Sequence, residues 1–265
     1  MTNSTTSCTK SISVSRFANM ALDIGELLIA SGAHCGRINR NIQRFADRWQ
    51  LKVDLFISFT VLSITVTNIE HPEETITVNR KATTSGVHFG ILTSISLLSW
   101  RVFESNLSVE ETEKEIKDIR STPRHSTWLV RLGIGLACAS LCILAGGNHI
   151  NAFFAFIAAT VGLIVKQSIT HRKFNPMIAI LLAAFVTTMI SGIDMYFGYG
   201  LSPETTVATS VLYLIPGVPL INCVIDLFEG YIPTAIARGT FGGFVLLCIA
   251  VGMSLSITLI GINNF

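Results

Sequence analysis

Hydrophobic positions in the first half of the chain follow helical and strand periods in turn. Apolar residues spaced three and four apart predict helices, and strict alternation of apolar and polar residues predicts strands. A Ser-Gly pair ends the first helix, and a capping box of Ser108 and Glu111 opens the last one. The expected helices cover residues 16–31, 38–49, 84–102 and 108–120, and the expected strands cover residues 53–59, 62–66 and 75–78. The pattern therefore predicts an α/β layer.

The second half of the chain contains five long apolar segments. They cover residues 127–146, 151–169, 177–197, 206–228 and 235–260. Each is long enough to cross the apolar core of a bilayer, which is about 30 Å thick. The expected fold class is an α-helical polytopic membrane protein with five transmembrane helices and an N-terminal cytoplasmic α/β domain.

The fourth apolar segment is interrupted by Pro216, Gly217 and Pro219. The two prolines remove backbone donors, so the carbonyls of Leu212 and Ile215 lose their usual helical partners and must be satisfied by a neighbouring helix, water or a ligand. The break falls roughly 15 Å into the segment, near the expected middle of the membrane. Many secondary transporters bind an anion at such a discontinuous helix. The alternative is a proline kink that only shapes packing.

Polar residues follow the break. Asn222 and Asp226 are four residues apart and share a helix face, and Arg238 opens the fifth apolar segment. The pattern favours a site in which the helix N-terminus after Pro219 binds a carboxylate and Asn222 orients it. Asp226 would then take or release a coupling proton, while Arg238 would balance the charge of Asp226 or receive the anion.

Composition separates the chain into a polar and an apolar half. Half of all residues are hydrophobic, 14% are charged and the mean hydropathy is +0.57, which excludes an ordinary soluble domain. Residues 1–131 hold 15 Lys and Arg and 13 Asp and Glu, whereas the remainder holds four of each. The expected division is a disordered leader at 1–15, a cytoplasmic α/β domain at 16–125 and a membrane domain at 126–265. A net charge of +2 argues against a nucleic-acid partner.

The distribution of positive charge predicts the orientation in the membrane. Lys and Arg flank the first apolar segment on its N-terminal side, occur between the second and third, and open the fifth. The other connections and the C-terminal residues lack them. The positive-inside rule then places the N-terminus in the cytoplasm and the C-terminus outside, in a bacterial inner membrane.

Catalytic and cofactor motifs are absent from the sequence. The six cysteines have no C-x-x-C spacing, and no G-x-S-x-G, H-E-x-x-H, P-loop or G-x-G-x-x-G is present. We therefore expect no enzyme, no cofactor, no metal and structural roles for the histidines. The arginines of the second helix are expected to form a solvated face, with contact to the cytoplasmic leaflet or a partner as the alternative. They are Arg37, Arg40, Arg44 and Arg48.

Two stretches resemble the threonine/serine exporter (ThrE) family. LLIASGAHCGRINRNIQRFADRWQL is similar to its opening motif, and LYLIPGVPLINCVIDLFEGYIPTAIAR is similar to its Pro-Gly-x-Pro-x-x-Asn-x-x-x-Asp membrane motif. The resemblance implies functional roles for two sets of residues. They are Ser31, Gly32, Ala33 and Arg37 in the first motif, and Pro216, Gly217, Pro219, Asn222, Asp226 and Arg238 in the second.

The resemblance also implies a function and partners. Full-length family members carry two membrane modules, and this chain is similar to the N-terminal one, as in the larger subunit of a two-gene branch. The expected activity is proton-coupled export of succinate-like dicarboxylates or of threonine and serine. The expected partner is a second, smaller membrane subunit, and assembly with further copies of this chain is left open. The alternative is a membrane-tethered hydrolase, or a regulatory or sensing module that transports nothing.

Overall fold

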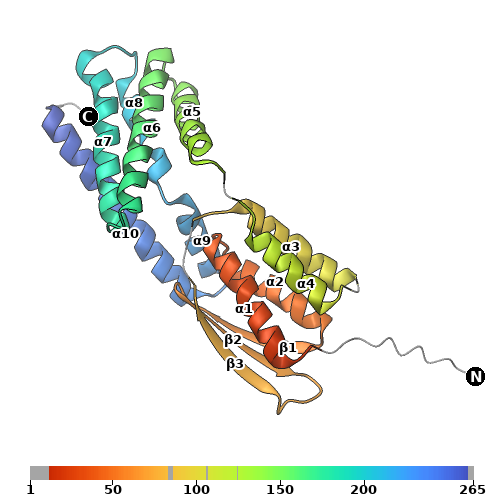
Figure 1. Cartoon of the computed structure of the whole chain (residues 1–265). Helices are drawn as coiled ribbons and strands as arrows, with labels where there is room; N and C mark the ends of the chain where they lie inside the picture. The colour runs from red at the N-terminus through yellow and green to blue at the C-terminus, as the bar shows by residue number, and fades with distance from the viewer. Residues whose placement is uncertain (1–11, 83–85, 106, 124, 262–265) are drawn as a thin grey trace, which may run out of the picture. The chain divides into compact units, whose positions relative to one another are not determined.

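The computed structural model describes residues 12–82, 86–105, 107–123 and 125–261 (Figure 1). Most of the expected leader, residues 1–15, lies outside this range. Its last two residues are helical, because the first helix, α1 (Val14–Ala30), begins after Ser13, whose hydroxyl accepts a hydrogen bond from the Arg16 N–H.

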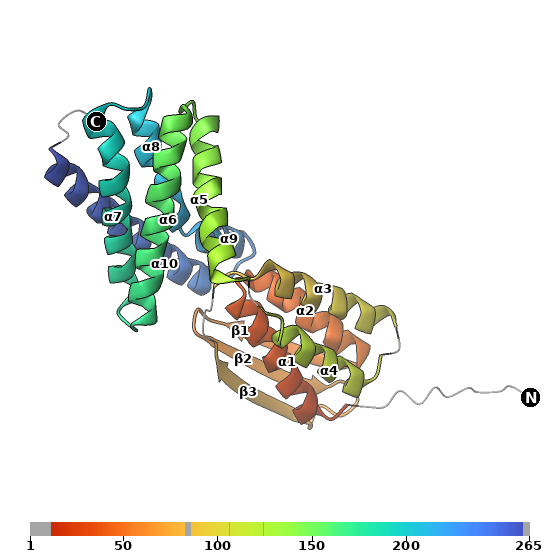
Figure 2. The same ribbon diagram turned by 45° about the horizontal axis from the view of Figure 1, so that its top comes forward.

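The N-terminal part of the chain is a sheet covered on one face by helices, as the sequence predicts (Figures 1 and 2). The helices are α1, α2 (Cys35–Arg48), α3 (Phe89–Glu104) and α4 (Val109–Arg120). The strands are β1 (Leu51–Ile57), β2 (Val61–Asn68) and β3 (Thr75–Lys81), which pair antiparallel in the order β1-β2-β3. The capping box of Ser108 and Glu111 opens α4 as expected.

The core of this layer comes from the alternation that defined the strands. Leu62, Ile64 and Val66 of β2 point to one face and are completely buried. They belong to one cluster with Phe17 of α1 and Phe45 of α2. Each such side chain contributes about 1.5–3 kcal/mol when it leaves water. This packing fixes the connection between α1 and α2, which carries the first family motif.

The remaining helices are apolar. They are α5 (Thr127–Leu144), α6 (His149–His171), α7 (Pro176–Phe197), α8 (Pro203–Ser210), the 3₁₀ turn η1 (Leu212–Leu214), α9 (Gly217–Phe228) and α10 (Ile232–Ile260). Four of the described helices, α5, α6, α7 and α10, are long and apolar enough to cross a membrane. The segments Pro203–Leu214 and Gly217–Phe228 are bent by 64° relative to each other, and together they count as a fifth span if they cross as one. Large apolar side chains are exposed along these helices, as expected for surfaces that face lipid.

Two backbone carbonyls at the break in the fourth apolar segment accept hydrogen bonds from within the same segment. The Leu212 carbonyl accepts a hydrogen bond from the Ile215 N–H at 3.1 Å, and the Ile215 carbonyl accepts one from the Gly217 N–H at 2.9 Å. The expectation that these two carbonyls need a partner outside the segment is therefore wrong. A tight turn satisfies both of them and redirects the chain.

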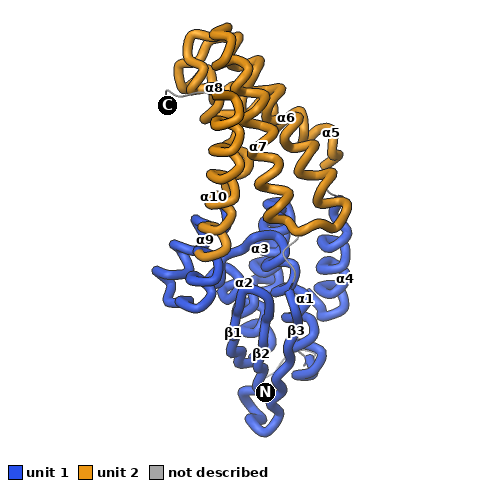
Figure 3. The backbone as a smooth tube through the Cα atoms, turned by 90° about the vertical axis from the view of Figure 1, so that its left-hand side faces the viewer, with its two compact units in different colours: residues 1–123, 218–239 blue, residues 124–217, 240–265 orange. Residues whose placement is uncertain are grey.

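The chain forms two compact units (Figure 3). Unit 1 contains residues Met1–Pro123 and Val218–Gly239, and unit 2 contains Arg124–Gly217 and Thr240–Phe265. The first boundary is close to the expected one at residue 125. The segment Val218–Gly239, which the sequence-based division assigns to the membrane domain, packs instead with the N-terminal residues.

Unit 2 contains a buried carboxylate near the start of α6. Asp194 is completely buried, and its carboxylate accepts hydrogen bonds from Asn151 Nδ2 at 2.7 Å, Thr206 Oγ1 at 2.7 Å and the Gly200 N–H at 2.8 Å. These contacts tie α6, α7 and α8 together. No ion pair to Asp194 occurs among the residues that the structure describes.

Candidate functional site

The two sequence motifs meet inside unit 1. Asn222 Nδ2 donates a hydrogen bond to the Gly32 carbonyl at 2.8 Å, and Arg238 Nη2 donates to the Ala33 carbonyl at 2.9 Å. The Cys35 N–H in turn donates to Asp226 Oδ1 at 2.7 Å. The sequence placed these motifs in separate domains, so their contact is the main finding at this site.

The loop between α1 and α2 presents these groups because of its backbone geometry. Gly32 has φ = +88°, a conformation that costs little only for glycine. The Ala33 N–H returns to the Leu28 carbonyl, and the Ser31 carbonyl accepts from the His88 N–H. The carbonyls of Gly32 and Ala33 are thereby left for Asn222 and Arg238.

Asp226 and Arg238 form a buried ion pair. Asp226 is completely buried and Arg238 is 7% exposed, and Arg238 Nη1 lies 2.9 Å from Asp226 Oδ2. The orientation of the two groups makes no hydrogen bond between these atoms, and neither atom has another hydrogen-bond partner among the described residues. The Asp226 carboxylate is also stabilised by the N-terminus of α2, to which it bonds through Cys35. The two charges therefore balance each other inside unit 1.

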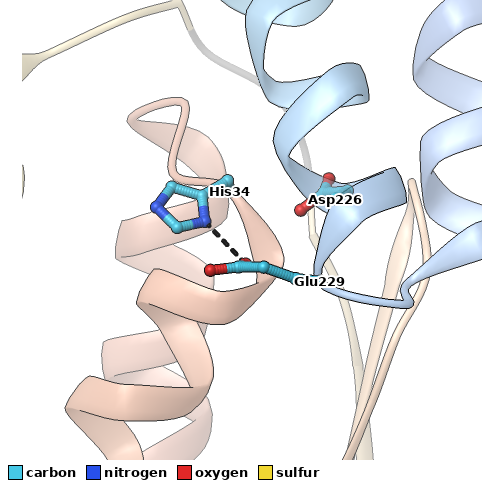
Figure 4. Close-up of side chains that lie close together, drawn as sticks. All are labelled: His34, Asp226 and Glu229. Carbon is cyan, nitrogen blue, oxygen red and sulfur yellow. Dashed lines mark hydrogen bonds and ion pairs between the residues drawn. The ribbon is translucent and has the colours of Figure 1, made fainter.

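Glu229 extends the cluster toward the surface (Figure 4). Its carboxylate accepts a hydrogen bond from Arg40 Nη1 at 2.9 Å and lies 3.1 Å from His34 Nδ1. Burial opposes ionisation of Glu229, but the hydrogen bonds from Arg40 and His34 outweigh it and lower the pKa of Glu229. His34 Nδ1 also lies 3.3 Å from the Arg37 N–H as the cap of α2, and one nitrogen cannot accept that bond and donate to Glu229 at once.

His34, Asp226 and Glu229 have ligand-type atoms within 4.8 Å of one another (Figure 4). Both carboxylates already have arginine partners, Arg238 for Asp226 and Arg40 for Glu229. A divalent cation would lie next to two guanidinium groups. The charges therefore describe an ion-pair cluster, and we assign no metal to it.

A cavity of about 110 Å³ adjoins Arg238. Its polar groups are supplied by Asn222, Arg238 and the first turn of α9, where backbone N–H groups lack helical acceptors. Its walls are otherwise apolar. The lining residues are Ile29, Ala30, Gly32, Phe59, Gly86, Val87, Val218, Pro219, Asn222 and Arg238. Pockets for drug-sized ligands are about 300–1,000 Å³, so this cavity suits a much smaller molecule with an anionic group.

Comparison with known proteins identifies the family. The family model described as "Putative threonine/serine exporter", ThrE, matches residues 19–260. The chain belongs to the ThrE family. A protein of Klebsiella aerogenes named "Probable succinate transporter subunit YjjP" is 33% identical, over 72% of this chain and 74% of its own length. Its Escherichia coli counterpart of the same name is 32% identical over the same shares. No solved structure matches.

A second kind of ThrE relative is longer. A "Probable threonine/serine exporter" of Mycobacterium tuberculosis is 23% identical over 93% of this chain but only 46% of its own length. The resemblance drawn from the two motifs is thus confirmed. Both groups of relatives carry names of transport proteins, which is consistent with an exporter.

The ThrE motif residues other than Arg37 divide into three groups by location. Gly32, Pro219, Asn222 and Arg238 line the cavity, and Asp226 pairs with Arg238. Ser31 and Ala33 hold the loop through their carbonyls. Pro216 and Gly217 form the bend between η1 and α9.

Arg37 lies away from the cavity. Its guanidinium donates to the Leu92 carbonyl and Ser96 Oγ of α3, which fixes α2 against α3. Arg44 stacks at 4.0 Å from the Trp100 ring centre. Arg40 is bound to Glu229, so Arg37, Arg40 and Arg44 of the expected solvated face make specific contacts. No local pattern indicated these partners, because they lie on other elements.

Cys35 is unsuited to nucleophilic chemistry although it adjoins His34. Burial and the nearby Asp226 charge raise the pKa of the Cys35 thiol to about 12. A thiolate would therefore be scarce at neutral pH. This observation removes the most reactive candidate for the hydrolase alternative.

Proposed function

We propose that this ThrE-family chain is the larger subunit of a two-component exporter of small carboxylates in a bacterial inner membrane. The candidate substrates are succinate-like dicarboxylates and amino acids such as threonine and serine. The names of the YjjP relatives support a subunit with a partner, and the longer exporters support a second module of similar size. We further propose that the partner is a smaller membrane protein, and that several copies of this chain can assemble with it.

The cavity beside Arg238 is the observation that supports carboxylate binding best. A carboxylate placed there would lie beside the positively charged Arg238 guanidinium, which lines the cavity. It would also face the N-terminus of α9 and Asn222. The apolar walls would cover the carbon skeleton of a small acid.

The Asp226–Arg238 pair offers a route to proton coupling. A substrate carboxylate beside Arg238 would share one guanidinium with Asp226, and two close carboxylates favour uptake of a proton. We propose that Asp226 carries this proton during export. Release of the proton would restore the ion pair and favour release of the substrate.

The proposed orientation keeps the N-terminal α/β domain, residues 16–125, in the cytoplasm and the C-terminus outside, with five crossings. A C-terminal alkaline phosphatase fusion is expected to be active and an N-terminal fusion silent. The reverse pattern would contradict this orientation.

The transport test uses a matched pair of variants. Val87 lines the cavity and Val61 lies on β2 away from it, and both are partly exposed. Val87→Phe fills the cavity while leaving the bonds of Asn222 and Arg238 in place. Uptake of radiolabelled succinate or threonine into inside-out vesicles containing both subunits, which corresponds to export from the cell, should therefore fall at least tenfold. Val61→Phe should transport normally. Equal transport by the two variants would rule out the cavity as the substrate site.

A further inference from the structure

Positive side chains gather in unit 2 where α5 begins and α6 ends. They belong to Arg131, Lys166, Arg172 and Lys173. None of the four forms an ion pair within the part of the chain that the structure describes. Asp194, by contrast, bonds to Asn151 at the start of α6, about 22 Å along the helix from Lys166 at 1.5 Å per residue. The cluster therefore has no acidic neighbour at its own end of the helices to balance it.

The cluster surrounds two adjoining hollows of about 500 Å³ and about 470 Å³, which share Gln167 and His171. Arg131 lines the first hollow and Lys166 the second. Arg131 Nε donates to Gln167 Oε1 at 2.7 Å, which fixes the guanidinium in place. Its two Nη groups make no hydrogen bond to a described residue and remain available to an anion.

The surroundings of Arg131 match the interface between headgroups and acyl chains. Arg131 is near the start of a span, and Lys166 is near the end of the next one. Trp128 is 66% exposed and lies 5.0 Å from the Arg131 guanidinium, and tryptophan beside a cation is typical of this depth. Leu132 and Leu136 continue the exposed apolar surface along α5.

We propose that this end of α5 and α6 binds the phosphate headgroup of an anionic phospholipid. Arg131 and Lys166 pair with the phosphate, and Gln167 holds Arg131 in position. The acyl chains lie along Trp128 and the exposed leucines of α5. The continuous apolar surface next to the cations favours a lipid over a free phosphate ion, which would leave that surface uncovered.

The test measures contact between lipid and Trp128. In the full-length variant Trp49→Phe/Trp100→Phe, Trp128 is the remaining tryptophan. Brominated cardiolipin should quench its fluorescence more than brominated phosphatidylcholine at the same mole fraction. Arg131→Gln and Lys166→Gln should each lower the preference about fivefold, the effect of one cation near an anionic surface. Lys52→Gln removes a charge from exposed β1 and should leave the preference unchanged.

Further measurements distinguish lipid binding from the binding of small anions and from misfolding. High salt should abolish the preference in the variant with intact Arg131 and Lys166. Added inorganic phosphate or succinate at equal ionic strength should leave the preference for cardiolipin unchanged. Displacement of cardiolipin by either anion would show a small-anion site instead. Native mass spectrometry of the unaltered chain should retain cardiolipin in preference to phosphatidylcholine. Equal retention, or a preference that survives loss of both cations, would overturn the proposal.

Discussion

The buried pair of Asp226 and Arg238 gives the sharpest prediction for the stability of unit 1. Asp226→Asn keeps a side-chain oxygen that can accept from the Cys35 N–H, but it removes the charge beside Arg238. Arg238 is 7% exposed and would keep its hydrogen bond to the Ala33 carbonyl. The variant therefore leaves a buried guanidinium without a counter-ion.

The expected cost follows from that geometry. Breaking a buried ion pair by removing one partner destabilises a protein by about 3–5 kcal/mol. For a domain of this size each kcal/mol lowers the melting temperature by about 2–4 °C, so a fall of roughly 6–20 °C is expected. Adding Arg238→Gln removes the unpaired charge and keeps a donor for Ala33. The double variant should therefore be more stable than Asp226→Asn alone.

The assay follows Trp49 and Trp100, which both belong to unit 1, during heating in detergent with Trp128 replaced by Phe. A shift below about 2 °C for Asp226→Asn would refute the reasoning, as would additive losses in the double variant. A transport assay tests the other proposed role of Asp226, which is proton coupling. An Asp226→Asn protein that melts normally but exports without regard to the pH gradient would assign Asp226 to coupling and not to stability.

Three further predictions concern single positions. Gly32→Ala should destabilise unit 1 by about 1–3 kcal/mol in the same melting assay, and by more than Gly86→Ala. Both glycines have positive φ, but of the two only Gly32 has a neighbour within 4 Å of an added Cβ. Asp194→Ala removes the shared acceptor of Asn151 Nδ2, Thr206 Oγ1 and the Gly200 N–H, at about 1–3 kcal/mol for each donor left without a partner. It should therefore lower the heat-aggregation temperature in detergent by more than Asp194→Asn, and equal effects would contradict this account. The folded-state pKa of Glu229 is lowered from 4.5, so the hydrogen bonds of its carboxylate stabilise the protein above that pH. This stabilisation is lost as the pH falls through the folded-state pKa. The difference in melting temperature between wild type and Glu229→Gln should therefore shrink in acid.

Local pattern was sufficient to predict most elements of the fold. The predicted first helix, residues 16–31, is close to α1, and the three strands appear in the predicted order, because amphipathic periodicity reflects which face of each element is buried. The errors occur where a side chain or turn interrupts a continuous pattern. α3 begins at Phe89 because His88 accepts a hydrogen bond from the Ile91 N–H as its cap. β1 ends at Ile57 because the Ser58 N–H bonds to the Val61 carbonyl across the hairpin.

The candidate site was predictable only in part. The sequence singled out Asn222, Asp226 and Arg238 because polar groups in apolar segments need partners. It could not identify those partners, because the groups that bind them lie about 190 to 205 residues away in sequence. Nor did it locate the cavity walls, which come from five separate parts of the chain. Contacts of such separation leave no local periodicity.

The internal hydrogen bonds of the break change how the second motif is understood. The Leu212 and Ile215 carbonyls each accept a hydrogen bond within the turn, so the break does not leave either of them without a partner. Its physical effect is the 64° change of direction before α9. Asn222 and Asp226 lie one turn apart on α9, so a single helix face supplies both the donor to the Gly32 carbonyl and the acceptor for the Cys35 N–H. Each of these four groups would be costly to bury without its partner, which is why the bend, the loop and the helix face are required together.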